Sequence, residues 1–137
     1  MEAVLQTVLT GLPVLTMHVI ATLAILAAGV WVYEKVTPYH EVQLIKDGNV
    51  AAAVTFSGAI LGIAIPLAFA MNASIGLIDV AIWGVITVVF QSITFVLLDI
   101  LMKDTRNRIE EEQMSAAVVM AAVKLAVGAI LAAAVAG

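Results

Sequence analysis

The chain has 137 residues, of which 64% are hydrophobic and 12% are charged, with a formal net charge of −4 and no cysteine. A soluble domain carries roughly 25% charged residues, so this chain holds more apolar surface than a water-soluble fold of its size can bury. The acidic balance argues against a nucleic-acid partner, and the lack of cysteine excludes disulfides, thiol nucleophiles and thiolate metal sites.

Four long apolar stretches follow one another, at residues 11–33, 50–71, 77–102 and 114–136. Each is close to the ~20 residues that cross a hydrocarbon core about 30 Å thick. We therefore predict an all-α membrane protein, with residues 1–137 forming one domain of four transmembrane helices in contact with the lipid bilayer. Gly11 and Pro13 are expected at the start of the first helix, where proline is tolerated. A cleaved signal peptide is not expected, because its first part should be basic and this chain offers only Glu2.

Lysine and arginine outside the apolar stretches are confined to two connections. Lys35 and Lys46 lie in the first connection, and Lys103, Arg106 and Arg108 lie in the third. The positive-inside rule assigns such loops to the cytoplasm. Both termini and the short second connection, residues 72–76, are therefore predicted on the non-cytoplasmic side of the membrane.

The chain also shows a weak internal repeat. At an offset of about 64 residues, residues 49–54 match residues 113–118, and Leu61 falls on Leu125. Each half, at about residues 11–71 and 77–136, forms one predicted helical hairpin that starts from the same side of the membrane. The sequence thus predicts two repeated hairpins related by an axis along the membrane normal.

The first connection contains a compact motif, namely Thr37, Pro38, Tyr39, His40 and Glu41. The Thr-Pro pair predicts the end of the first helix, and the Gly-Asn pair at residues 48–49 predicts the turn and N-cap of the second. A His-Glu pair can perform acid–base chemistry, but no nucleophile or second acid accompanies it here. We interpret the motif as a docking surface or a helix cap.

Residues 33–49, with residues 51–53 and 57–67, resemble the YjfL-like family of bacterial inner-membrane proteins, known as domain of unknown function 350. The similarity continues through Trp83, Gly84 and Gln91 and covers nearly the whole chain. It implies a small four-helix protein of the bacterial inner membrane without an established activity. Residues 114–115 and Ala132 depart from the family pattern, which weakens the transfer of a polar function to the fourth helix.

Polar side chains inside the apolar stretches form a candidate intramembrane site, made of Lys124, Gln91, Asp99 and His18. A lysine near the bilayer midplane costs about 2.5–3.5 kcal/mol on insertion scales, so Lys124 should have a partner. Gln91 matches it in depth, and Asp99 is within reach if the lysine snorkels towards the cytoplasm. The set could bind an ion or an anionic substrate, or it could be a structural link between helices.

The second helix carries small residues at helical spacing, and Gly58 and Gly62 should let another helix approach closely. Pro66 leaves the carbonyl of Gly62 without its usual donor and should bend the outer end of the helix. Helix packing is the expected role of all three residues, although such a bend can also act as a gate.

No P-loop, nucleotide-binding fingerprint, zinc-protease motif or nucleophile elbow is present, so we expect no enzyme, no catalytic residue, no cofactor and no metal site. Two functions remain open. One is a small homo-oligomeric transporter or channel-like protein whose path runs along Gln91, Lys124 and His18. The other is a membrane scaffold for envelope maintenance, whose cytoplasmic loops at residues 34–48 and 103–113 bind a partner protein. Polarity at the midplane favours transport.

Overall fold

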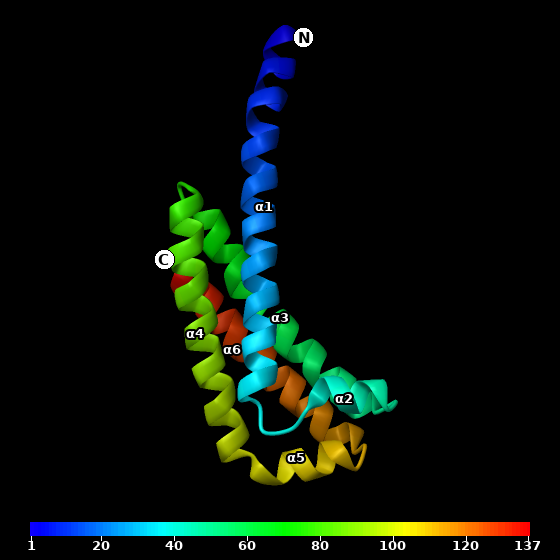
Figure 1. Cartoon of the computed structure of the whole chain (residues 1–137). Coiled ribbons are helices and arrows are strands. Elements are labelled where there is room, and N and C mark those ends of the chain that lie inside the picture. The colour runs from blue at the N-terminus through cyan, green and yellow to red at the C-terminus, as the bar shows by residue number, and fades with distance from the viewer.

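The computed structural model describes residues 1–137. It contains six helices: α1 (Glu2–Val36), α2 (Glu41–Lys46), α3 (Val50–Ala73), α4 (Leu77–Leu101), α5 (Lys103–Glu110) and α6 (Met114–Ala136). Four of them, α1, α3, α4 and α6, are long and apolar enough to cross a membrane, which confirms the four predicted spans. The short helices α2 and α5 were not predicted. They lie at one end of the bundle, opposite the N-terminus (Figure 1).

The helix α1 is longer than predicted, because it begins at Glu2 and contains Pro13 in its interior. The expectation that the helix starts near Gly11 is therefore wrong. Pro13 removes a single backbone donor, and the preceding residues are mostly good helix formers that continue the helix across the gap. The upper part of α1 extends well beyond the other helices (Figure 1). Its large apolar side chains, from Met1 to Leu15, are each more than 50% exposed.

The helices α3 and α6 form the central pair and approach each other through glycine. A Cβ atom on Gly58 would lie 2.6 Å from the Cα of Ala121, and one on Gly62 would lie 2.8 Å from the carbonyl oxygen of Lys124. From the opposite helix, a Cβ on Gly128 would lie 2.6 Å from the carbonyl oxygen of Gly62. The two backbones are thus too close for any larger residue at these positions, as is usual where membrane helices pack through small residues.

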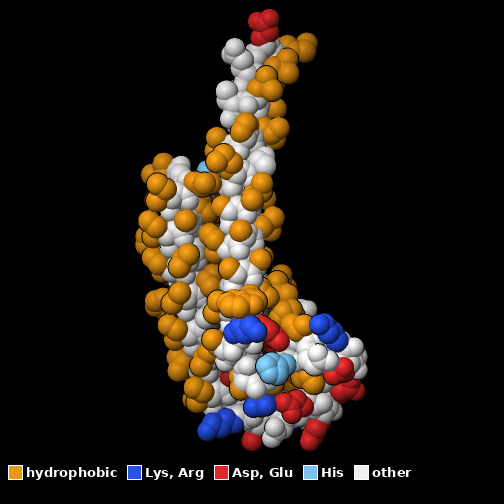
Figure 2. Space-filling view, viewed as in Figure 1, with side chains coloured by type: hydrophobic (Ala, Val, Ile, Leu, Met, Phe, Trp, Pro, Cys, Tyr) orange, Lys and Arg blue, Asp and Glu red, His pale blue; other side chains and the backbone are white.

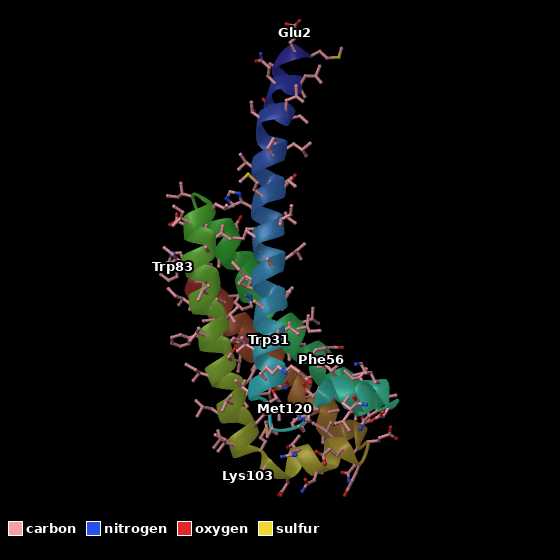
Figure 3. The ribbon with its side chains drawn as sticks, viewed as in Figure 1. Glu2, Trp31, Phe56, Trp83, Lys103 and Met120 are labelled. Carbon is pink, nitrogen blue, oxygen red and sulfur yellow. The ribbon has the colours of Figure 1, made fainter.

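The helices α1 and α4 lie beside each other and also contact α3. Buried side chains of Tyr33, Ile63 and Phe95 fill the space between these three helices. The rings of Tyr33 and Phe95 meet edge-on, with their centroids 5.5 Å apart. Figure 3 shows Trp83 on the outer surface of α4 and Lys103 at the other end, where α5 begins.

The two connections at the α2 and α5 end are tied to each other. The Oδ1 of Asn49 accepts a hydrogen bond from the backbone N–H of Ala52 at 2.8 Å, which confirms the predicted N-cap of α3. The Nδ2 of the same side chain donates to the carbonyl oxygen of Ile109 at 2.9 Å. Gly48 has a φ of +91°, in the left-handed region that favours glycine. Most charged side chains visible in Figure 2 gather over this end of the molecule.

Candidate functional site

The lysine in the middle of α6 is completely buried and lies among side chains from α1, α2 and α4. The Nζ of Lys124 donates a hydrogen bond to the hydroxyl oxygen of Tyr33 and lies 3.9 Å from the Oε1 of Glu41. It also lies 4.7 Å from the ring centroid of Tyr33 and 5.4 Å from that of Phe95. Lys124, Tyr33 and Glu41 each have 0% exposure, and we call these three residues the buried cluster.

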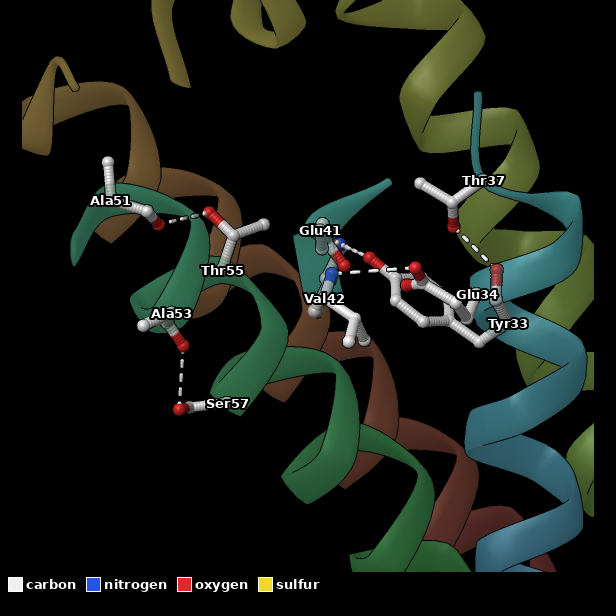
Figure 4. A network of polar contacts seen from close by, with 10 residues as sticks. Tyr33, Glu34, Thr37, Glu41, Val42, Ala51, Ala53, Thr55 and Ser57 are labelled. Carbon is white, nitrogen blue, oxygen red and sulfur yellow. Dashed lines mark hydrogen bonds and ion pairs between the residues drawn. The ribbon is translucent and has the colours of Figure 1, made fainter. Parts of the chain in front are cut away.

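The connection after α1 brings Glu41 into the bundle. The helix α1 ends at Val36, and the hydroxyl of Thr37 donates to the carbonyl oxygen of Tyr33 at 2.7 Å. Thr37, Tyr39 and Glu41 are buried, whereas the intervening Pro38 and His40 are exposed. Figure 4 shows Glu41 facing Tyr33 across the space between α1 and α3.

The alternation of buried and exposed side chains leaves little of the motif at residues 37–41 available as a docking surface. Three of its five side chains point inwards, and His40 stands at the N-cap of α2 without a capping side-chain hydrogen bond. Most of the motif is therefore occupied in positioning the buried cluster, and only Pro38 and His40 offer their side chains to an external protein.

Burial raises the pKa values of two side chains of this motif, Glu41 and Tyr39. It raises the pKa of Glu41 from 4.5 to about 7, against the opposing effect of the positive charge of Lys124. Burial also raises the pKa of Tyr39, and the carboxylate of Glu41 adds to this effect. The charge of Lys124 is the largest influence that favours the ionised carboxylate, and the nearby hydroxyl groups of Tyr33 and Tyr39 act in the same direction.

The other members of the predicted intramembrane site do not join Lys124. The expectation of a partner on α4 was wrong in its first choice, because the Nε2 of Gln91 donates instead to the carbonyl oxygen of Gly62 at 2.9 Å. This is the carbonyl that Pro66 leaves without a backbone donor. Asp99 makes no hydrogen bond or ion pair with Lys124. His18 is half-buried, and its Nδ1 forms a hydrogen bond with the carbonyl oxygen of Val14 in its own helix at 2.8 Å.

The contact between Gln91 and Gly62 gives a prediction with a built-in rescue. Replacing Gln91 with leucine should lower the free energy of unfolding by about 1 kcal/mol, because the buried carbonyl of Gly62 then has no hydrogen-bond donor. In a Pro66→Ala background the backbone N–H of residue 66 can bond to that carbonyl again. The same Gln91→Leu change should then cost little. Thermal denaturation of the four proteins in one detergent measures this coupling, and equal costs in both backgrounds would contradict the assignment.

Several hollows open beside α4, and the two largest lie one towards each end. The first has a volume of about 520 Å³ and is lined by Tyr39, Asp99 and Arg106, among others, next to α5. The second has a volume of about 430 Å³ and lies between α3, α4 and α6, where Thr87 contributes to its lining. These hollows mark the two ends of the polar part of α4.

Between the hollows, α4 carries buried polar atoms without hydrogen-bond partners. They are both carboxylate oxygens of Asp99, the Oε1 of Gln91, the Oγ of Ser92 and the Oγ1 of Thr87. The positions from Thr87 to Asp99 span about 18 Å of helix. Phe95, which is fully buried, lies one helical turn from Asp99 and one turn from Gln91. Thr87 and Gln91 lie on one face of α4, and Ser92 and Asp99 lie on the neighbouring face. Buried polar atoms are rarely left unpaired, so these faces indicate places for water or an ion.

Sequence reasoning missed Tyr33 and Glu41 as neighbours of Lys124. The depth of a residue along its own helix predicts partners only among residues within the spans. Glu41 lies in a connection that folds back between the helices, so depth alone could not find it. The available signal was the segment of residues 33–41, which includes the motif and places two carboxylates and two tyrosines within nine residues at one membrane face.

Comparisons with known proteins agree with the helical membrane architecture. Residues 7–135 match the family described as Domain of Unknown Function (DUF350). The chain is 36% identical over 98 residues to the UPF0719 inner membrane protein YjfL of Escherichia coli K12, covering 72% of this chain and 74% of that protein. The protein of the same name from Escherichia coli O157:H7 matches with the same identity and coverage. No solved structure matches.

Proposed function

The chain belongs to the DUF350 family of inner-membrane proteins, and we propose that it is a small homo-oligomeric, channel-like transport protein that passes protons along α4. The observation that carries this proposal is the set of unpaired buried polar atoms on two neighbouring faces of α4, between the hollow beside Asp99 and the hollow beside Thr87. A purely structural polar network would be expected to satisfy its own hydrogen bonds.

The buried cluster gives the path a group that can exchange protons near neutral pH. Burial brings the pKa of Glu41 to about 7, so this carboxyl group can both bind and release a proton under physiological conditions. Lys124 and Tyr33 lie beside it and can stabilise its charged form. Phe95 lies against the cluster, with its ring centroid 5.4 Å from the Nζ of Lys124, and it stands one helical turn from Gln91. The proposed role is not enzymatic.

Proton flux into liposomes tests this proposal. Purified protein in liposomes loaded with a pH-sensitive dye should dissipate an imposed pH gradient faster than protein-free liposomes do. Replacing Thr87 with valine removes a hydroxyl that makes no hydrogen bond and keeps the shape of the side chain. This variant should therefore keep its thermal stability and lose most of its flux. Wild-type flux equal to that of empty liposomes would contradict the proposal.

The proposed orientation places α2 and α5 in the cytoplasm and both termini outside. It is supported by the five lysine and arginine residues around these two short helices and by their absence from the turn between α3 and α4. Since the chain has no cysteine, single cysteines report topology directly. An impermeant thiol reagent added to whole spheroplasts should label Ile75→Cys, which is 96% exposed, and should leave Asn107→Cys unlabelled. The reverse pattern would invert the orientation.

Two further features belong to the proposed assembly. The order of a long, a short and a long helix occurs twice, and the equivalent helices α3 and α6 form the central pair, which supports an internal repeat of two hairpins. The exposed apolar side chains on the upper half of α1 support a homo-oligomer, because they extend past the bundle to which they belong.

A scaffold for envelope maintenance is the alternative function. It relies on the exposed side chains of α2 and α5, and the burial of Thr37, Tyr39 and Glu41 leaves less of the motif for a partner protein. A protein that folds normally, carries no proton flux and is retained by a bound partner would favour this alternative over transport.

A further inference from the structure

The hollow beside α5 is lined by two buried polar groups that form no close hydrogen bond, although the carboxyl group of Glu41 lies near one of them, the Tyr39 hydroxyl. Asp99 lines it, and both of its carboxylate oxygens are buried without a hydrogen-bond partner. Tyr39 lines it too; this residue is only 3% exposed, and its hydroxyl also lacks a partner. A desolvated carboxylate next to an unpaired phenol is costly unless a donor from outside the chain fills the space.

Charge is distributed unequally in this hollow. The carboxylate of Asp99 is buried, whereas the basic side chains of Lys103 and Arg106 also contribute to the lining and are exposed. Lys103 has no ion pair, and the pair between Arg106 and Glu110, at 3.1 Å, is itself well exposed and therefore weak. The remaining lining, which includes Val96 and Ile100, is largely apolar.

We propose that this hollow binds a small zwitterion, with a primary ammonium group on Asp99 and Tyr39 and an anionic group on Lys103 and Arg106. An ammonium group brings three N–H donors to acceptors that have none. A simple cation would be repelled by the two basic side chains, and a simple anion by Asp99. The inference does not depend on transport, because binding can be measured without a membrane gradient.

Two sources can supply this chemistry. One is the headgroup of phosphatidylethanolamine, since Asp99 lies near the end of α4, where the helix leaves the membrane. The other is a free zwitterion in the cytoplasm, for which phosphoethanolamine is a suitable probe. Both carry a primary ammonium group and a phosphate. Their choline counterparts carry the same charges but have no N–H group to donate, and they provide matched controls.

The test measures binding of these four compounds to delipidated protein in detergent, by native mass spectrometry for the lipids and calorimetry for the soluble probes. At least one ethanolamine compound should bind about tenfold or more tightly than its choline counterpart, as expected for a charge-assisted hydrogen bond. Asp99→Asn should remove this preference, whereas Asp104→Asn, an exposed acid on α5 outside the hollow, should keep it. The double variant Lys103→Gln and Arg106→Gln should weaken the binding of both compounds.

The outcomes separate cleanly. A preference seen with the lipid alone supports the inference and identifies a headgroup site, and a preference seen also with phosphoethanolamine supports it and identifies a free zwitterion. Equal binding of ethanolamine and choline compounds, or an unchanged preference in Asp99→Asn, overturns it. Tyr39→Phe provides a second variant that removes only one hydroxyl, and it should reduce the preference as well. Binding results leave the flux experiment unaffected, so the failure of one proposal does not decide the other.

Discussion

Replacing Gly58 with leucine is expected to prevent the formation of a stable bundle. The smallest side-chain atom at this position, a Cβ, would already lie 2.6 Å from the Cα of Ala121, and that atom belongs to a backbone that cannot rotate away. The helices α3 and α6, which form the most extensive helix–helix interface in the molecule, would have to move apart. In detergent, the variant should give little or no monodisperse protein on size exclusion, and its thermal transition should be lost.

A matched control lies in α1. Gly11 has no atom within 4 Å of an added Cβ, so Gly11→Leu introduces the same side chain into open space. This control should keep the wild-type elution profile and nearly the wild-type melting temperature. If Gly58→Leu and Gly11→Leu behaved alike, the backbones of α3 and α6 would not be in close contact at Gly58.

Replacing Lys124 with methionine should strongly destabilise the protein at pH 8, by about 3–5 kcal/mol, because Glu41 then loses the positive charge that stabilises its buried carboxylate. The effect should depend on pH. Burial raises the pKa of Glu41 to about 7 in the folded protein from its ordinary value of 4.5. The folded state thus holds this proton more tightly, and the associated stability is complete below about pH 4.5 and lost as the pH rises through about 7.

The loss of the positive charge of Lys124 raises the pKa of Glu41 further, since that charge opposes the effect of burial. Lys124→Met should therefore be much closer to wild-type stability at pH 5 than at pH 8, as thermal denaturation across this range can measure. Adding Glu41→Gln to Lys124→Met should restore much of the stability at pH 8. A cost that is the same at both pH values would show that Glu41 is not the group paired with Lys124.

The main elements of the fold could be predicted from the sequence because they depend on local signals. Apolar length fixed the four spans, the Thr-Pro pair ended α1, and the cap at Asn49 followed from the Gly-Asn pair. The start of α1 was misplaced because one proline removes only one hydrogen bond, which a long helix can tolerate. The short helices α2 and α5 depend on packing against α3 and α6, which no local signal encodes.

The candidate site was only partly predictable. The burial of Lys124 and the freed carbonyl of Gly62 follow from the position of each residue in its own helix. Which donors and acceptors they contact depends on how the helices are rotated relative to each other. In the structure Gln91 donates to the carbonyl of Gly62, and Lys124 interacts with Tyr33 and Glu41 instead. The polar residues within the spans thus show which side chains need partners, but not which partners they find.

The most direct measurement of the central claim is proton flux through the double variant Lys124→Met and Glu41→Gln, in parallel with its thermal stability. This variant neutralises the buried pair while keeping side chains of similar size, so it should fold. If the buried cluster exchanges protons, the reconstituted variant should be as stable as wild type within about 1–2 kcal/mol and should carry no flux above that of empty liposomes. A folded double variant that conducts protons as fast as wild type would contradict the account.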